Sequence, residues 1–252
     1  MDGREHIVLL SGGKDSTAMA LRLAEVEPRD YIYLCTPTGN ELPDMVDHFS
    51  RLEEILGQEI VQVTERTLYG IIMEQNMIPN FRARFCTRML KIEPFKAYLL
   101  GHLPAVAYVG LRADEAEREG VEYTEPQIRE QLVQRYPLTE WEWGLRDVMA
   151  YLNSREVSIP ERTDCAVCFF QRLDEWWRLW RDQPEEMDKG IVVEEAIGYT
   201  FRSDTRDTWP AALKDLKGEF ERGRVPRNAP LMDDMFHEKD RIAQSKCRMC
   251  SI

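Results

Sequence analysis

Short apolar runs alternate with amphipathic stretches through the first 110 residues of this chain. The apolar runs predict strands at residues 6–10, 31–35, 59–63 and 105–111. Between them, apolar positions at helical spacing predict helices at 16–26, 43–56 and 88–100. Strands that alternate with helices predict an α/β fold, a parallel sheet with helices on both faces, whose ligands gather at the carboxyl ends of the strands.

The pattern changes after about residue 136. Helical spacing predicts helices at 144–153, 168–182, 184–196 and 209–222, and we expect no strand among them. Leu173, Trp176, Trp177 and Trp180 share one helix face, which is typical of a buried stripe rather than of a base-stacking platform. We therefore expect an α/β domain over 1–135 and a mostly helical region with cysteine pairs over 136–252.

Composition narrows the class of protein. With 252 residues, 43% of them hydrophobic, the chain can bury a sizeable core. The net charge of -12 argues against a broad electrostatic hold on nucleic acid, so any such contact is expected to be local. The absence of a signal-peptide pattern and of about 20 consecutive apolar residues predicts a cytoplasmic protein with no membrane partner, where the six cysteines stay reduced.

The predicted first strand leads directly into Ser-Gly-Gly-Lys-Asp-Ser at residues 11–16, and a helix follows. Glycines let the backbone approach an anion, and the helix directs its unpaired N–H groups at it. Lys14, expected on an exposed helix start, would add a positive charge, Asp15 would hold Mg²⁺, and Ser16 would cap the helix or donate to a phosphate oxygen. The alternative interpretation is an ordinary tight turn. The complete hexapeptide, placed between a strand and a helix, favours phosphate binding over this alternative.

This hexapeptide resembles the PP-loop of ATP pyrophosphatases and of the phosphoadenosine phosphosulfate (PAPS) reductase family. Residues 38–43 (Thr-Gly-Asn-Glu-Leu-Pro) are similar to that family's Thr-Gly-x-Glu-x-Pro loop. Residues 110–115 (Gly-Leu-Arg-Ala-Asp-Glu), with Arg118, are similar to its Gly-x-Arg-x-Asp-Glu segment, and residues 135–141 to its Pro-Leu-x-x-Trp segment. The resemblance covers about residues 6–170 in order.

The resemblance implies a Rossmann-like PP-loop fold that binds an adenine nucleotide, either ATP or PAPS, with Mg²⁺. The residues that it implies in nucleotide binding follow the ends of the predicted strands. They are Ser11, Gly12, Gly13, Lys14, Asp15, Ser16, Thr38, Gly39, Glu41, Gly110, Arg112 and Glu115.

Residues 82–91 place four cations and one thiol in ten residues of an acidic protein. Arg88 and Lys91 lie three apart at a predicted helix start, so both can face one anion. The alternative is a solvated basic face with a buried cysteine, but neighbouring cations would lower the pKa of the Cys86 thiol and favour reactivity. We expect the catalytic groups to be Lys14, Asp15, Cys86, Arg88 and Lys91.

The remaining cysteines suggest a metal site. Cys165 and Cys168 form one Cys-x-x-Cys pair, and Cys247 and Cys250 form another. Four thiolates are the number of ligands that either Zn²⁺ or a [4Fe-4S] cluster requires. The alternative is that the four thiols are unrelated. The paired symmetry favours zinc. The resemblance favours iron–sulfur, because its members join a similar pair to an upstream cysteine, although those members carry adjacent cysteines where this chain has only Cys86.

Other polar groups carry weaker signals. Cys35 ends a predicted strand and is expected to be a core residue. Residues 200–207, with Arg202, Arg206 and Asp207, are either a second anion loop or an exposed turn. The four histidines lie in no motif, and we assign them no catalytic role.

The resemblance implies an enzyme that adenylates an acceptor with ATP, releases pyrophosphate and then transfers sulfur. The acceptor would be a small molecule or a nucleic acid, and a sulfur donor protein would be a partner. One alternative is a sulfonucleotide reductase that releases sulfite, against which the absence of that group's Glu-Cys-Gly-x-His segment argues. The other is a non-catalytic adenine-nucleotide sensor.

Overall fold

The computed structural model describes residues 3–115 and 122–229, and its centre is a parallel sheet. The five strands follow the order β3-β2-β1-β4-β5, and every pairing is parallel. The strands are β1 (Glu5–Leu9), β2 (Tyr31–Cys35), β3 (Val61–Gln62), β4 (Ala105–Tyr108) and β5 (Leu132–Arg135). The predicted parallel α/β fold is confirmed.

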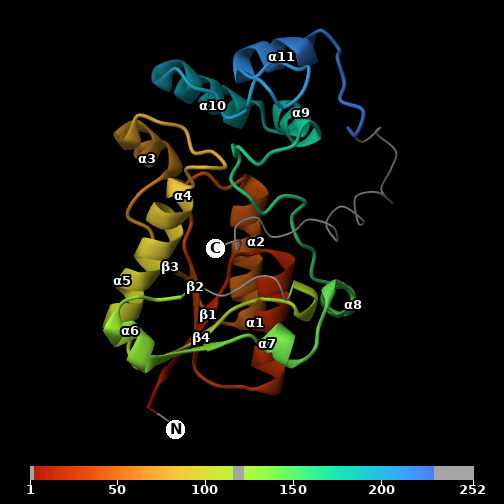
Figure 1. The fold of residues 1–252 in the computed structure, drawn as a ribbon. Coiled ribbons are helices and arrows are strands. Elements are labelled where there is room, and N and C mark those ends of the chain that lie inside the picture. Colours follow the sequence, from red (N-terminus) through yellow and green to blue (C-terminus); the bar gives the residue numbers. More distant parts are fainter. Residues whose placement is uncertain (1–2, 116–121, 230–252) are drawn as a thin grey trace.

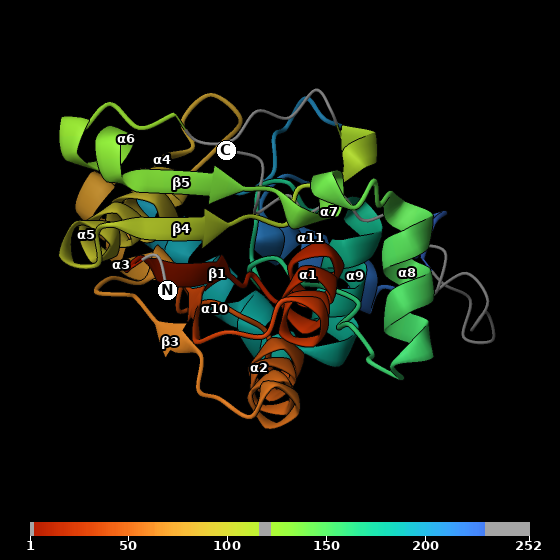
Figure 2. The ribbon, with the colours of Figure 1, turned by 90° about the horizontal axis from the view of Figure 1, so that it is seen from below.

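Successive residues of β1 face opposite sides of the sheet, as a strand requires. Ile7 packs with Phe95 and Leu99, whereas Val8 packs with Ala18 and Leu21. Figure 2 accordingly shows helices on both sides of the strands. One side carries α5 (Glu93–Gly101) and α6 (Pro126–Gln131), and the other carries α1 (Lys14–Val26), α2 (Pro43–Leu56), α7 (Pro137–Glu140) and α8 (Leu145–Ser154).

Several predicted bounds differ from the observed ones. Strand β5 was not predicted, because residues 132–135 carry only Leu132 and Val133 as apolar residues, and pairing with β4 decides their conformation. The helix predicted at 88–100 is instead α4 (Phe85–Thr87), a π-helical turn (Arg88–Ile92) and α5. Pro94 explains the wide turn, since it has no N–H to donate and its ring crowds the carbonyl four residues earlier.

Three helices form a separate layer at the top of Figure 1, which we call the helical lobe. They are α9 (Leu173–Asp182), α10 (Pro184–Ile197) and α11 (Leu213–Glu221). Helix α9 begins later than the predicted residue 168, because the Glu175 carboxylate accepts from the Arg172 N–H (2.6 Å) and caps the helix there. The predicted buried stripe is confirmed, since Trp176 and Trp177 are buried and Trp180 is partly buried.

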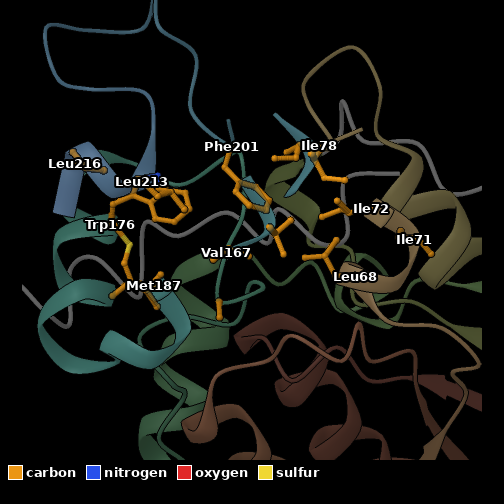
Figure 3. Packing of buried hydrophobic residues seen from close by; sticks show 14 of the residues in the cluster. Leu68, Ile71, Ile72, Ile78, Val167, Trp176, Met187, Phe201, Leu213 and Leu216 are labelled. Atoms are coloured by element: carbon orange, nitrogen blue, oxygen red, sulfur yellow. The ribbon is translucent and has the colours of Figure 1, made fainter. Parts of the chain in front are cut away.

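The helical lobe packs on α3 (Leu68–Gln75), which precedes α4. Figure 3 shows Trp176, Met187 and Leu213 of the lobe on one side of Val167 and Leu68 on the other. All five side chains belong to one buried cluster. Residues 166–167 therefore lie between the lobe and the sheet domain.

Helices α7 and α8 lie against α1 rather than in the helical lobe. The division of the chain after residue 135 stays a prediction. Within residues 3–115 and 122–229, no helix is both long and apolar enough to cross a membrane.

Candidate functional site

The loop after β1 has the shape that its glycines permit. Gly12 has a φ of 75°, and a Cβ there would lie 2.6 Å from the Cε atom of Met45. The Ser16 hydroxyl donates to the Gly13 carbonyl (3.1 Å) and accepts from the Ser11 N–H (3.1 Å). Gly13, not Ser16, is the N-cap of α1, so Ser16 closes the loop instead of capping the helix. We call residues 11–16 the phosphate loop.

Lys14 and Asp15 are buried at the start of α1, with Nζ and Oδ2 3.8 Å apart. The expectation that Lys14 lies on an exposed helix start is wrong, because the residue is only 4% exposed. Burial raises the pKa of Asp15, although Lys14 and Arg112 oppose the rise. The first turn of α1 therefore holds a positive and a negative group in an environment that strengthens electrostatic interactions.

The loop after β4 is in direct contact with the phosphate loop. A Cβ on Gly110 would lie 3.1 Å from the Cα of Ser16, so only glycine lets the two backbones approach this closely. Arg112 Nη1 then donates to both carboxylate oxygens of Asp15 (2.9 Å each). Strands β1 and β4 are neighbours in the sheet, which brings these two predicted nucleotide-binding segments together.

Arg112 contacts two further carboxylates. Its Nε donates to Asp114 Oδ1 (2.8 Å), and its Nη2 lies 3.3 Å from Glu115 Oε1. Asp114 also accepts from the Leu145 N–H (2.9 Å), which ties the start of α8 to the same loop. Arg112 thus positions three acidic groups around the phosphate loop.

The loop after β2 is shaped by Glu41. Its carboxylate accepts from the Thr38 N–H (2.6 Å), the Thr38 hydroxyl (2.7 Å) and the Asn40 N–H (3.1 Å). Gly39 has a φ of 69°, and a Cβ there would lie 2.7 Å from Thr67 Cγ2. Glu41 therefore holds the conformation of this loop, and a direct role for it toward nucleotide stays a prediction.

The first Cys-x-x-Cys pair lies against this loop, which sequence reasoning did not foresee. The Ala166 N–H donates to the Asn40 carbonyl (2.7 Å), and the Val167 N–H donates to Asn40 Oδ1 (3.1 Å). Cys165 Sγ lies 3.3 Å from Thr38 Oγ1. Because Thr38 has a single hydroxyl proton and directs it at Glu41, the Cys165 thiol is the donor here. We call residues 165–168 the thiol segment.

The cysteines of this region are held as neutral thiols. Burial raises the pKa of Cys165 to about 11, with Lys91 opposing, and burial also raises the pKa of Cys168. The expectation of an acidic Cys86 is wrong, because burial raises its pKa despite Lys91 and Arg84 nearby. Lys91 lies near both Cys86 and Cys165, whereas Arg88 is exposed and pairs with Glu93 (2.5 Å).

The predicted metal site lies only partly within the described residues. Cys247 and Cys250 lie outside residues 3–115 and 122–229. Within those ranges, no group of three or more His, Cys, Asp or Glu side chains could hold a metal ion. Zinc or iron–sulfur binding therefore stays a prediction. Cys35 is buried, with its pKa raised to about 12 by burial, which confirms its interpretation as a core residue.

Two polar residues have places that sequence reasoning missed. His48 of α2 is 1% exposed and its ring hydrogen-bonds the Gly12 backbone, while burial lowers its pKa to about 4. It shares the apolar face of α2 with Met45 and Leu52, which was the available signal. Arg202 is buried and pairs with Asp207 (2.9 Å), so in residues 200–207 this arginine stabilises the fold.

Comparison with known proteins identifies relatives. Residues 5–162 match the phosphoadenosine phosphosulfate reductase domain. An uncharacterised protein of Methanocaldococcus jannaschii is 26% identical over 221 residues, which is 82% of this chain and 53% of that protein. The chain thus spans about half the length of that curated relative.

Two solved structures are also similar. A phosphoadenylyl-sulfate (PAPS) reductase from Candida auris, solved as a phosphate complex, has a TM-score of 0.49 and 15% identity, over 64% of this chain and 77% of that one. An NH3-dependent NAD synthetase from Campylobacter jejuni has a TM-score of 0.42 and 12% identity, over 91% of each chain. The matched phosphoadenosine phosphosulfate reductase domain takes up more than half of this chain, so the chain belongs to that domain family.

Proposed function

We propose that this protein binds ATP with Mg²⁺, adenylates an acceptor with release of pyrophosphate, and thereby prepares the acceptor for sulfur transfer. The observation that carries the proposal is the close packing of the phosphate loop on the loop after β4, where a Cβ on Gly110 would lie 3.1 Å from the Cα of Ser16. Strand order reverses between β1 and β4, and ligands of open parallel sheets bind at such a position. Family membership supports the use of a nucleotide by this PP-loop protein.

The buried charges suit a nucleotide triphosphate. The N–H groups at the start of α1 and the Lys14 ammonium would bind phosphate oxygens and stabilise the negative charge of departing pyrophosphate. Asp15 is a buried carboxylate, and the charge of Glu115 helps to raise its pKa. One or two carboxylates beside phosphates fit Mg²⁺, so Asp15 with Glu115 would hold the ion, which would supply positive charge to the phosphates.

The chemistry conserves atoms and electrons without a redox partner. An oxygen of the acceptor attacks the α-phosphorus, and the bond from this phosphorus to the oxygen bridging the β-phosphate breaks. A sulfur nucleophile delivered as sulfide by a donor protein then displaces AMP from the activated carbon. The thiol segment beside the Thr38 loop supports a sulfur reaction at this edge of the sheet.

A second candidate is a sulfonucleotide reductase, favoured by the 3.3 Å contact of Cys165 Sγ with Thr38 Oγ1. In this reaction the Cys165 thiolate attacks the sulfur of PAPS, and the sulfur–oxygen bond to the nucleotide breaks. Cys168 then attacks Cys165 Sγ, so that sulfite leaves and a disulfide remains. The raised pKa values of both thiols oppose this reaction in the absence of bound nucleotide.

One experiment separates these functions. The purified protein, handled anaerobically, is incubated with ATP and separately with PAPS, and pyrophosphate and sulfite are measured. We expect pyrophosphate from ATP in the presence of an acceptor, no product from Lys14→Ala, and unchanged product from Lys214→Ala, whose side chain is exposed. Sulfite from PAPS would establish the reductase, and binding without either product would establish a sensor.

We also propose that Cys165, Cys168, Cys247 and Cys250 together hold Zn²⁺ or a [4Fe-4S] cluster. Cys165 and Cys168 supply half of such a site, because they lie close enough for the charge of a Cys165 thiolate to help raise the pKa of Cys168, and a bound metal would deprotonate both thiols. Elemental analysis of the purified protein tests this. Loss of metal in Cys168→Ser but not in Cys35→Ser is expected, and metal-free protein of normal stability would contradict it.

A further inference from the structure

An exposed aromatic ring stands beside the thiol segment. Phe81 is 63% exposed. Its ring packs edge to face on Phe169, with centroids 5.2 Å apart, and on Phe170, with centroids 4.9 Å apart. Two aromatic partners restrict the motion of the ring, so Phe81 offers an ordered apolar face to solvent.

Two arginines accompany this ring. Arg82 follows Phe81 in the chain and is exposed, and the Arg84 guanidinium lies 5.2 Å from the centroid of Phe170. Residues 75–92 contain no Asp or Glu, although the chain as a whole has a net charge of -12. We call Phe81, Phe170, Arg82 and Arg84 the Phe81 surface. Its charge is complementary to a polyanion and opposite to that of the rest of the protein.

The Phe81 surface adjoins the proposed site of chemistry. Phe169 and Phe170 directly follow Cys168 in the chain. The same segment hydrogen-bonds Asn40 in the loop after β2 through the Ala166 and Val167 N–H groups. A ligand on Phe81 would thus lie next to the thiols and the nucleotide loops.

We propose that the Phe81 surface binds a single-stranded nucleic acid, with an unpaired base stacked on Phe81 and phosphates on the arginines. An aromatic face beside cations binds a base and its phosphates at the same time. An acidic peptide would need only the cations and would leave the aromatic face unused. That this nucleic acid is the acceptor rests on the proposed function, but the binding of the nucleic acid to the Phe81 surface does not. The area is too local for a duplex, which needs contacts along a broad basic face.

The test is fluorescence anisotropy with labelled single strands of about 12 nucleotides, as DNA and as RNA. Phe81→Ala should weaken binding about tenfold, and Phe81→Trp should preserve it. Tyr199→Ala is the matched control, because Tyr199 is an aromatic residue after α10 that is 62% exposed. It should leave binding unchanged.

The arginines are tested through salt dependence. Removing one phosphate contact should reduce the slope of log K against log salt by about 0.7 in Arg82→Ala. Arg222→Ala, which removes an exposed arginine directly after α11, should not change it. The comparison of DNA with RNA identifies which strand is preferred.

Four results would overturn the inference: no binding to either strand, equal affinity of Phe81→Ala and wild type, tighter binding of a duplex, or tighter binding of polyglutamate. Calorimetry with ATP separates it from the proposed function. Phe81-dependent strand binding without ATP binding would refute the proposed function alone. Normal ATP binding without strand binding would refute only this inference.

Discussion

Asp15 in the phosphate loop and Glu194 in the helical lobe are both buried carboxylates, but their hydrogen-bond and ion-pair partners differ. Asp15 faces the cations Lys14 and Arg112. Glu194 accepts from two backbone N–H groups, those of Phe201 (2.8 Å) and Leu213 (2.7 Å). Burial raises the pKa of each, and that of Glu194 rises to about 7.

The difference separates a candidate reaction site from a fold-stabilising contact. Backbone donors are fixed by the helix and loop that carry them, so Glu194 joins α10 to the loop at Phe201 and to the first residue of α11. Cations on separate loops can exchange one anion for another, so the pairs around Asp15 can be rearranged when phosphates bind.

Arg112→Ala should have the largest effect. It leaves Asp15 and Glu115 buried without their shared cation, and breaking such a pair costs about 3–5 kcal/mol. Chemical denaturation measures the loss of free energy of unfolding. Arg222→Ala, at an exposed position, is the matched control. A loss below about 1 kcal/mol would show that the carboxylates do not depend on this cation.

Glu194 should make the stability of the wild type depend on pH. Its folded-state pKa of about 7 exceeds the ordinary value of 4.5, so the folded state binds more protons between these values. Stability therefore falls as pH rises from about 4.5 to 7, by roughly 3 kcal/mol at most. Denaturation of Glu194→Gln across this range should lack that decline, whereas exposed Glu195→Gln should keep it. A Glu194→Gln profile parallel to that of wild type contradicts the assignment.

Gly12 in the phosphate loop and Gly198 after α10 have the same backbone conformation, with φ values of 75° and 76°. Gly198→Ala should cost about 1 kcal/mol from backbone strain alone, because no atom lies within 4 Å of its added Cβ. Gly12→Ala should cost more and weaken ATP binding, since its Cβ meets Met45. Thermal unfolding and calorimetry measure both effects, and equal behaviour of the two variants would refute the close packing of the phosphate loop.

Asn40→Ala tests the link between the two regions. It leaves the buried Val167 N–H without its acceptor, at a cost of about 1–3 kcal/mol, and should loosen the thiol segment. Mass spectrometry should then find faster alkylation of Cys165. Asn80→Ala is the control, because Asn80 accepts only from its neighbours Arg82 and Ala83. Unchanged alkylation in Asn40→Ala would mean that other contacts hold the thiol segment.

Cys86 should show the smallest effect. Burial raises its pKa above the ordinary value of 9.0, so its alkylation should reach half of the maximal rate only above that pH. Cys86→Ser should change the free energy of unfolding by less than about 1.5 kcal/mol. An alkylation midpoint near neutral pH would contradict the raised pKa and support the acidic thiol that the neighbouring cations predict.

Local patterns were enough to predict most of the sheet and the loops of the candidate site. Strands β1, β2 and β4 are buried apolar runs, and the helices between them show clear periodicity. Strand β5 was missed because its conformation depends on pairing with β4 rather than on its own residues. The pKa of Cys86 was mispredicted because a list of neighbouring charges contains no information on burial.

The sequence by itself determined which residues follow the strand ends, because glycines, charges and apolar periods are local properties. It therefore predicted the parallel sheet, the phosphate loop and the loops that flank it. Only the tertiary structure decided that Arg112 pairs with Asp15, that Lys14 is buried, and that the thiol segment hydrogen-bonds Asn40. The two hydrogen bonds join residues that are 97 and 127 positions apart, and packing of separate elements, not local propensity, brings such residues together.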